Sequence, residues 1–184
     1  PKDSEQKPDR MRTLTPQELM KHSGYFAKKN MDGFDIYVRP AKIDIQGEDY
    51  GQPYIFVDDI DQEKMQKLED VGLPLAIKNE SSPGNFHGWI RVGNEPMKAE
   101  ELTRASKIVA KNIGADEGAA DWRHYGRLSG FTNQKPTRRK DNGHAPFVKT
   151  TVTKGHDIAP NGPALMQAAQ KRIAAELADR QEQA

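Results

Sequence analysis

The sequence predicts an α+β fold in a single domain. A length of 184 residues suits one domain. Short runs rich in β-branched and aromatic residues, such as residues 54–58, are separated by longer runs with apolar residues at helical spacing, such as residues 99–113. Turn-forming residues lie between many of these runs. Strands and helices are therefore expected to interleave along the chain.

The first elements are predicted between residues 1 and 52. Residues 1–14 are polar and predict a loose leader. Thr15, Pro16 and Glu18 match a capping box with proline at the first helical position, which predicts a helix from residue 15 to about residue 29. The run that follows, residues 34–40, alternates and favours a strand, whereas residues 43–52 are rich in turn formers and predict an irregular connection.

The middle of the chain supplies most of the predicted sheet. The predicted strands cover residues 54–58, 73–78, 86–92 and 147–153. The predicted helices cover residues 61–71 and 99–113, and Gly114 ends the second. A turn is expected at residues 81–85, while residues 121–140 have no clear period.

A C-terminal helix is predicted to begin at Asn161-Gly162-Pro163. Its apolar stripe consists of Leu165, Ala169, Ile173 and Leu177. We expect three regions: a leader over residues 1–14, a catalytic core over residues 15–156, and a linker with this helix over residues 157–184. Because the chain starts at Pro1 rather than at methionine, we expect it to be a piece of a larger polypeptide in which a helical domain follows.

The composition narrows the classes of partner. There are 28 Lys and Arg residues against 27 Asp and Glu residues, a net charge of +1, so any nucleic-acid surface has to be local. The absence of cysteine excludes disulfides and thiolate zinc sites, so no zinc is expected, and it fits a reducing, cytoplasmic location. No apolar run approaches the ~20 residues that span a bilayer, and we expect no membrane partner.

Carboxylates in two distant stretches are the strongest chemical signal. Asp58 and Asp59 end an apolar run, and Asp121 opens the segment of residues 121–135. Carboxylates at a strand end are a common way to hold Mg²⁺ or Mn²⁺. Strict alternation would put Asp58 and Asp59 on opposite faces, so they converge only if the strand ends or bulges there. The nearby Asp61 is either a further ligand or the N-cap of the helix after it.

A basic stretch follows Asp121. From residue 122 to residue 156 the only acid is Asp141, and Tyr125, Phe131 and Phe147 are interleaved with the charges. A basic stripe with aromatic residues is typical of nucleic-acid binding. Its cations are Arg123, Arg127, Lys135, Arg138, Arg139, Lys140, Lys149 and Lys154. His124 adds to this cluster, and Gly126 and Gly130 permit close approach of the backbone.

Two aromatic residues on the strand of residues 86–92 have two interpretations each. The turn before the strand can aim His87 at a phosphate, or His87 is an ordinary strand histidine. Trp89 shares its face and is either part of the core or a stacking surface for a base.

Three motifs resemble a known family. They are YIFVDDI at residues 54–60, NESSPGNFHGWIRV at residues 79–92 and ADWRHYGRLSGFTNQK at residues 120–135. The chain resembles the RepB-like primases of mobilisable plasmids, including the primase domains fused to MobA-type relaxases, which belong to the archaeo-eukaryotic primase superfamily. DIYVRP at residues 35–40 and GPAL at residues 162–165 are similar as well, so the resemblance spans about residues 33–168.

The resemblance implies a compact primase-like core, with a mixed or antiparallel sheet flanked by helices and a C-terminal helix. It implies synthesis of short primers on single-stranded DNA, in plasmid replication or conjugative mobilisation, by nucleotidyl transfer with two divalent ions, Mg²⁺ or Mn²⁺. The implied partners are a single-stranded DNA template, NTP or dNTP, a relaxase domain in the same polypeptide and a replicative helicase.

The family motifs also assign roles to residues. Asp58, Asp59 and Asp121 would be catalytic and would hold the metal ions. The residues expected to bind nucleotide are Ser82, His87, Arg123, His124 and Arg127. Those expected to bind DNA are Trp89, Phe131, Lys135, Arg138, Arg139 and Lys140.

Two alternatives remain open from the sequence. The first is a non-catalytic single-stranded DNA-binding module of a mobilisation protein, using Trp89, Phe131 and the basic stripe. The second is a relaxase-type nuclease, which needs a metal-binding histidine cluster and a nucleophilic tyrosine. The histidines, which form no tight cluster in the sequence, are His22, His87, His124, His144 and His156.

Overall fold

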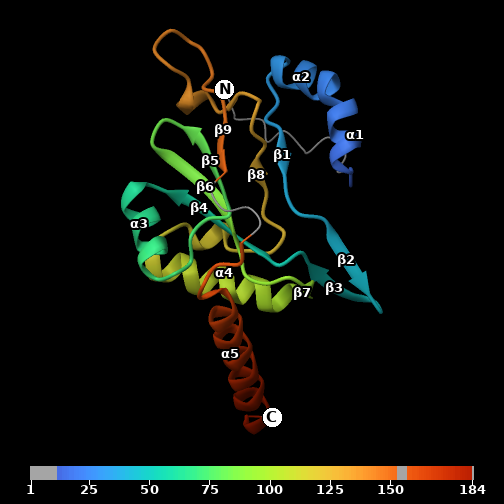
Figure 1. Cartoon of the computed structure of the whole chain (residues 1–184), viewed down its shortest axis with the longest axis vertical. Helices are drawn as coiled ribbons and strands as arrows, with labels where there is room; N and C mark the ends of the chain where they lie inside the picture. The colour runs from blue at the N-terminus through green and yellow to red at the C-terminus, as the bar shows by residue number, and fades with distance from the viewer. Residues whose placement is uncertain (1–11, 153–156, 184) are drawn as a thin grey trace.

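A four-stranded antiparallel sheet forms the centre of the molecule (Figure 1). The computed structural model describes residues 12–152 and 157–183. Strand order in the sheet is β4-β6-β5-β9, and the strands are β4 (Tyr54–Ile60), β6 (Asn85–Arg91), β5 (Ile77–Ser82) and β9 (Lys149–Val152). Three of the helices pack against one face of the sheet, and the predicted α+β class with an antiparallel sheet is confirmed.

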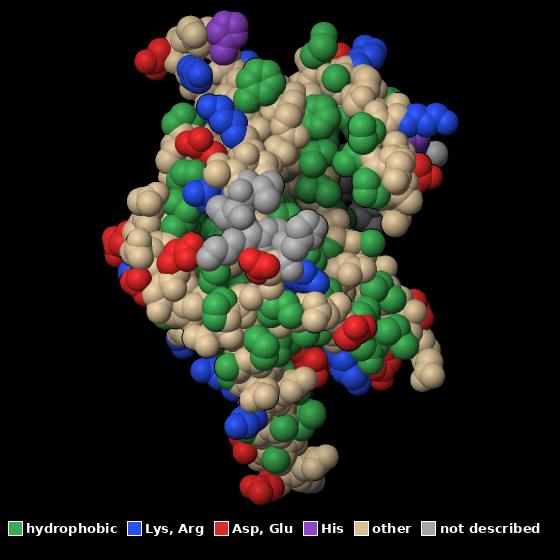
Figure 2. Space-filling view, in the orientation of Figure 1, with side chains coloured by type: hydrophobic (Ala, Val, Ile, Leu, Met, Phe, Trp, Pro, Cys, Tyr) green, Lys and Arg blue, Asp and Glu red, His purple; other side chains and the backbone are tan. Residues whose placement is uncertain are grey.

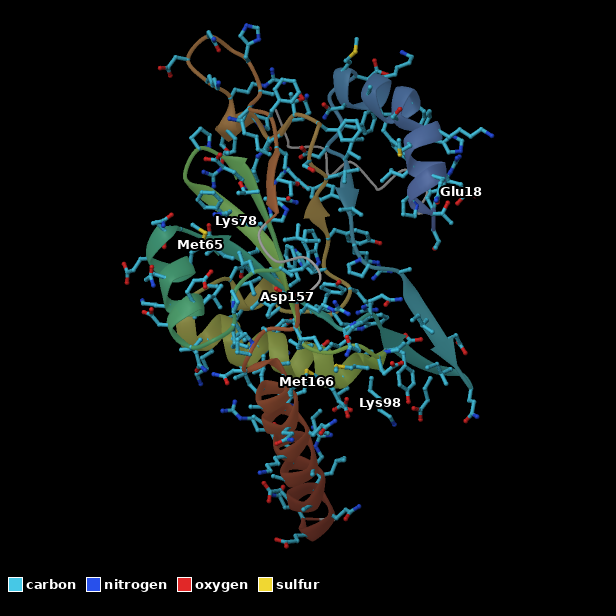
Figure 3. All side chains as sticks on the ribbon, viewed as in Figure 1. Glu18, Met65, Lys78, Lys98, Asp157 and Met166 are labelled. Carbon is cyan, nitrogen blue, oxygen red and sulfur yellow. The ribbon has the colours of Figure 1, made fainter. Side chains whose placement is uncertain are left out.

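The main core lies between one face of this sheet and three helices, α3 (Gln62–Asp70), α4 (Ala99–Ile113) and α5 (Gly162–Glu182). Ile55, Val57 and Ile90 supply the sheet side of the core and are almost fully buried. Figure 3 labels Met65 on α3 and Met166 on α5, and both side chains are buried in this core. The predicted apolar face of α4 is confirmed, because all of its members are buried: Leu102, Ala105, Val109 and Ile113.

The described part of the chain begins with a helical region. The capping box is confirmed, since Glu18 N–H donates to Thr15 Oγ1 at 3.2 Å and Thr15 N–H donates to Glu18 Oε2 at 2.8 Å. The single helix predicted to residue 29 is wrong, because His22 leaves the helical conformation at φ −94° and ψ 6°. Two helices result, α1 (Pro16–Lys21) and α2 (Ser23–Met31).

Two smaller sheets lie beside the central one. A two-stranded sheet pairs β1 (Tyr37–Val38) with β8 (Gly126–Arg127). A three-stranded sheet joins β2 (Lys42–Ile45), β3 (Glu48–Gly51) and β7 (Met97–Lys98). The irregular connection predicted over residues 43–52 is therefore wrong: β2 and β3 form a hairpin. Its turn residues Gln46 and Gly47 have φ of 55° and 82°, the positive values that a tight hairpin turn requires.

Several predicted bounds shift in the structure. The strand predicted over residues 34–40 is reduced to β1, because only Tyr37 and Val38 find a partner strand. The strand predicted over residues 73–78 begins later, at Ile77, although Leu73 and Leu75 are buried as an apolar run suggests. A short 3₁₀ helix, η2 (Pro136–Arg138), lies within the region without a clear period, and another, η1 (Glu117–Ala119), lies just before it. The predicted leader falls mostly on residues outside the described ranges, as does the end of the strand predicted to residue 153.

The buried side chains of helix α5 all lie in its first half. Leu165 and Ala169 of the predicted stripe are buried, whereas Leu177 is 52% exposed. Figure 1 shows the second half extending away from the rest of the molecule. Arg104 on α4 fixes the helix by donating from Nη1 to Glu176 Oε1 at 2.6 Å. Within the described residues, no helix is both long and apolar enough to cross a membrane.

Candidate active site

The two consecutive carboxylates lie in a β-bulge. Val57 pairs with Gly88 and Ile60 pairs with Phe86, so Asp58 and Asp59 together lie opposite the single residue His87. Asp59 has φ of 55°, an unusual value for a residue other than glycine. Bulges re-aim side chains and occur often beside active sites. The sequence analysis required a bulge or a strand end for Asp58 and Asp59 to converge, and the bulge is present.

Hydrogen bonds hold the bulge in place. Asp59 N–H donates to Asp58 Oδ1 at 2.8 Å, and Lys64 Nζ donates to the Asp59 carbonyl oxygen at 2.7 Å. The Asp59 carboxylate accepts from Asn85 Nδ2 at 3.3 Å. Asp58 is half-buried and Asp59 is exposed, so both carboxylates reach the surface of the sheet. Asp61 is not part of this group: its Oδ1 accepts from Lys64 N–H at 2.9 Å as the N-cap of α3.

An aromatic floor lies on the same face of the sheet as Asp58. Phe56 and Trp89 pair across β4 and β6, with ring centroids 5.2 Å apart. His124 stacks on Phe56 at 5.1 Å and 20°. Since His124 belongs to the downstream segment, this contact brings residues 121–127 against β4. The two distant stretches that carry the predicted carboxylates thus meet on one face.

Asp121 is turned toward its own segment. Its Oδ1 accepts from Arg123 N–H at 2.7 Å, and Arg123 Nη2 lies 3.6 Å from its Oδ2. Oxygen donors of this type suit Mg²⁺ or Mn²⁺. However, nowhere in residues 12–152 and 157–183 do three acidic or histidine side chains converge closely enough to hold a metal ion. The chain segments that carry Asp58, Asp59 and Asp121 lie against each other, but the three carboxylates do not form a ready-made metal site.

Arg127 is held by a residue that the sequence analysis missed. Its Nε donates to Asp35 Oδ1 at 3.1 Å and its Nη2 donates to Asp35 Oδ2 at 3.0 Å. Gln134 N–H also donates to Asp35 Oδ1, at 2.8 Å. The guanidinium lies over the ring of Tyr37 at 5.2 Å. A two-point ion pair of this kind fixes the plane of the guanidinium. The signals at Asp35 are its place in the alternating run of residues 34–40 and in the family-like DIYVRP run, and neither indicates a partner for its side chain.

His87 is buried under the segment that carries Arg127. Its side chain is 2% exposed, and its Nε2 lies 3.2 Å from both Asn79 Nδ2 and the Arg127 carbonyl oxygen. Asn79, also missed as a functional residue, donates to that carbonyl oxygen at 3.1 Å and accepts from Thr150 Oγ1 at 2.7 Å. Burial lowers the pKa of His87, although the nearby charge of Asp58 opposes the shift. The imidazole of His87 thus lies away from solvent, within hydrogen-bonding distance of the Arg127 backbone.

Trp89 does not offer a surface for a base. Its side chain is only 5% exposed, because the segment of residues 121–127 covers it. A Cβ on Gly126 would lie 2.4 Å from Trp89 Cη2, which confirms the close backbone approach expected at this glycine. The burial of Trp89 fits the alternative interpretation as a core residue, and its expected role in DNA binding stays a prediction. Ser82 is buried too, and its Oγ has no hydrogen-bond partner among the described residues.

Most members of the basic stripe within the described residues are exposed, as a binding surface requires. Its exposed members after the site are Lys135, Arg138, Arg139, Lys140 and Lys149, and Phe131 in the same segment is half-buried. Asn133 is different: it is 1% exposed and donates to the Ser81 carbonyl oxygen at 2.8 Å, so it holds the loop and is not free for a base. Arg39, which the sequence analysis left without a role, donates to the Arg123 carbonyl oxygen at 3.2 Å. It thereby ties the strand region before β2 to the site segment.

The fold and the motifs together match a known family. Residues 20–168 match the model of the RepB DNA-primase N-terminal domain. The chain belongs to this family. The resemblance of the three motifs to RepB-like primases is thus confirmed, and the match covers most of this chain.

Two named proteins are similar to this chain in sequence. The chain is 32% identical over 172 residues to "Mobilization protein A" of Escherichia coli, covering 94% of this chain and 23% of that protein. It is 26% identical over 140 residues to a "DNA primase" of Acidithiobacillus ferrooxidans, covering 75% of this chain and 38% of that protein. The chain therefore spans well under half the length of either relative.

Two crystal structures are similar in both fold and sequence. The crystal structure of primase RepB' has a TM-score of 0.79 at 32% identity, covering 94% of this chain and 55% of that one. The catalytic domain of primase RepB' in complex with initiator DNA has a TM-score of 0.77 at 32% identity, covering 92% of this chain and 81% of that one. The primase-like fold is confirmed. A cyanophage S-2L primase-polymerase domain, with a TM-score of 0.53 at 14% identity, shares the fold alone.

Proposed function

We propose that this chain is the catalytic domain of a primase that joins nucleotides into short primers on single-stranded DNA. The observation that carries the proposal is the bulge at Asp58 and Asp59, which lies on the sheet face that the Asp121–Arg127 segment covers. Membership of a family with relatives named primase supports the same reaction. The similarity to a mobilisation protein supports a setting in plasmid mobilisation, with a relaxase in the same polypeptide.

The proposed chemistry is metal-dependent nucleotidyl transfer. Asp58, Asp59 and Asp121 would hold divalent ions, Mg²⁺ or Mn²⁺, and all three carboxylates are at least partly exposed. Bound ions of this kind polarise phosphoryl oxygens and promote loss of the proton from an attacking hydroxyl. Because the three side chains are not gathered in the described structure, binding would require Asp121 to turn away from Arg123.

The positively charged side chains would bind the triphosphate. Arg123 is exposed and its planar guanidinium matches a phosphate at two points. Arg127 is held in a fixed orientation by Asp35, which leaves little conformational entropy to lose when a phosphate binds. His124, stacked on Phe56, lies on the same floor. These groups would stabilise the negative charge that develops during transfer.

Incorporation of labelled nucleotides on a single-stranded template tests the proposal. Because the chain covers only part of its relatives, a template with an annealed primer should be included, so that transfer chemistry is tested apart from initiation. We expect labelled products with Mg²⁺ or Mn²⁺, none with EDTA, and recovery when excess metal is restored. DNA binding without incorporation under any of these conditions would favour the non-catalytic DNA-binding module instead.

A further inference from the structure

We propose that the outer edge of strand β2 pairs with the same edge of a second copy of this chain, so that two molecules form a symmetric dimer. This surface contains none of the candidate site residues, and the inference does not depend on the proposed function. Strand β2 (Lys42–Ile45) stands at the end of the three-stranded sheet β2-β3-β7. Figure 1 shows the β2–β3 hairpin projecting from the rest of the molecule.

The backbone of β2 presents hydrogen-bonding groups along this edge. Ile45 pairs with Glu48 across a two-residue turn. Such a turn closes on a hydrogen-bonded pair, and hydrogen-bonded and non-hydrogen-bonded pairs alternate from there. The N–H and C=O groups of Lys42 and Asp44 therefore point away from β3, and within the described residues no other strand pairs with β2. An edge of this kind is a template for a further strand.

The order of residues along the edge is self-complementary. In an antiparallel pair centred on Ile43, Lys42 lies opposite Asp44 of the partner subunit, and the same contact recurs on the other side of the two-fold axis. Ala41 lies opposite Ile45 of the partner subunit, so apolar residues also meet apolar residues. Because alternate residues of a strand share a face, the ion pairs lie on one face and the apolar pairs on the other. This pairing also joins the outward N–H and C=O groups of the two strands.

Charge selects this register over its neighbours. A shift by two residues in one direction places Lys42 opposite Lys42 of the partner subunit. A shift in the other direction places Asp44 opposite Asp44 of the partner subunit. Like charges directly opposite one another destabilise a strand pair, whereas opposite charges stabilise it. The edge therefore specifies one way for a second copy to pair with it.

The charges within one hairpin favour the arrival of a second lysine. Asp44 lies directly opposite Asp49, an unfavourable arrangement for two exposed carboxylates. Lys42 Nζ forms an ion pair with Asp49, whereas Asp44 has no ion pair within the described residues. The Asp44 carboxylate accepts only from a backbone group there, Gly47 N–H at 3.0 Å. In the dimer, Lys42 of the partner subunit supplies the missing cation.

The other face of the hairpin offers apolar surface to the dimer. Ile45 is 39% exposed, and Ile43 and its cross-strand neighbour Tyr50 are half-buried. Figure 2 shows hydrophobic side chains among acidic and basic ones at the lower right, where this hairpin lies. The contact between two such strands is smaller than the ~1,600 Å² of a standard interface. We therefore expect the dimer to form at high protein concentration.

Sedimentation equilibrium over a range of protein concentrations tests the proposal. For wild type, the average mass should rise with concentration from 20.6 kDa toward twice that value. Asp44→Lys places two lysines opposite each other twice in the strand pair, and should weaken association at least about tenfold. The hairpin should persist, because the new side chain lies opposite Asp49. Asp179→Lys is the matched control: it makes the same change of charge on an exposed residue of α5 and should associate like wild type.

A charge reversal separates pairing from net charge. The double variant Lys42→Asp with Asp44→Lys has the net charge of wild type and reverses the order of the two charges on the edge. Each lysine again lies opposite an aspartate of the other copy, so association should return to nearly the wild-type strength. A lysine also remains opposite Asp49, as in the single variant. Recovery of this kind is not expected if Asp44→Lys acts through net charge alone.

Amide hydrogen exchange measured by NMR locates the interface. The N–H groups of Lys42 and Asp44 should become more protected as the concentration rises. Those of Ile43 and Ile45 point toward β3, so their protection shows in every variant that the hairpin is formed. Four results would overturn the proposal: a wild-type chain that stays monomeric, an Asp44→Lys variant that associates like wild type, a reversed variant with an intact hairpin that does not associate, or a dimer in which the Lys42 and Asp44 amides gain no protection.

Discussion

Replacing Asp58 with Asn is expected to lower the rate of nucleotide incorporation by about 1000-fold, which corresponds to several kcal/mol of lost metal-ion stabilisation. Asn has nearly the shape of Asp, and its carbonyl oxygen can still accept the hydrogen bond from Asp59 N–H. The bulge should therefore survive, while the negative charge that attracts a divalent ion is lost. The measurement is the initial rate of incorporation on a primed single strand.

Asp116→Asn is the matched control for this change. Asp116 is exposed and its backbone N–H lies 3.5 Å from the Asp58 carbonyl oxygen, so the variant removes a negative charge close to the bulge. Its carboxylate accepts from Gly118 N–H, which an Asn side chain can also do. We expect nearly full activity. If Asp58→Asn keeps wild-type activity, or if both variants lose activity equally, Asp58 has no specific role.

A methyl group at Gly126 is expected to damage both the fold and the site. The added Cβ would lie 2.4 Å from Trp89 Cη2 and 2.8 Å from His87 Nε2, and both side chains are buried. Overpacking of this kind costs about 1–3 kcal/mol. For a chain of this size we expect Gly126→Ala to lower the Tm by about 5 °C, since 1 kcal/mol corresponds to roughly 2–4 °C. Incorporation should fall as well, because the clash displaces the neighbouring Arg127.

Gly24→Ala separates this clash from the general effect of replacing glycine. Gly24 lies in α2, and a Cβ there would have no neighbour within 4 Å. Because alanine favours the helix, the Tm should stay the same or rise slightly. A Gly126→Ala variant with wild-type Tm and activity would show that the segment of residues 121–127 does not pack on Trp89 and His87.

Local sequence signals predicted the elements whose cause is local. The capping box at Thr15 and Glu18 was confirmed, and so was the apolar face of α4, because both depend on residues three or four apart. The hairpin of β2 and β3 was missed, since its turn residues Gln46 and Gly47 are a weak turn signal and its strands are mostly exposed. Composition alone could not distinguish it from a loop.

The candidate site was predicted in part, for a similar reason. A pair of acids after an apolar run pointed to Asp58 and Asp59, but only the pairing with β6 reveals the bulge opposite His87. The ion pair of Arg127 with Asp35 joins residues 92 positions apart and has no signature along the chain. Trp89 kept two interpretations, because alternation gives the face of a strand but not what covers that face.

The most direct test is a crystal structure of the chain with Mn²⁺ and a non-hydrolysable nucleoside triphosphate. The anomalous signal of manganese locates the ion independently of the protein. The account predicts a peak about 2.0–2.3 Å from carboxylate oxygens of both Asp58 and Asp121, with Asp121 turned away from Arg123. An ion bound elsewhere, with the Asp58 and Asp121 carboxylates still apart in the presence of bound nucleotide, would contradict it.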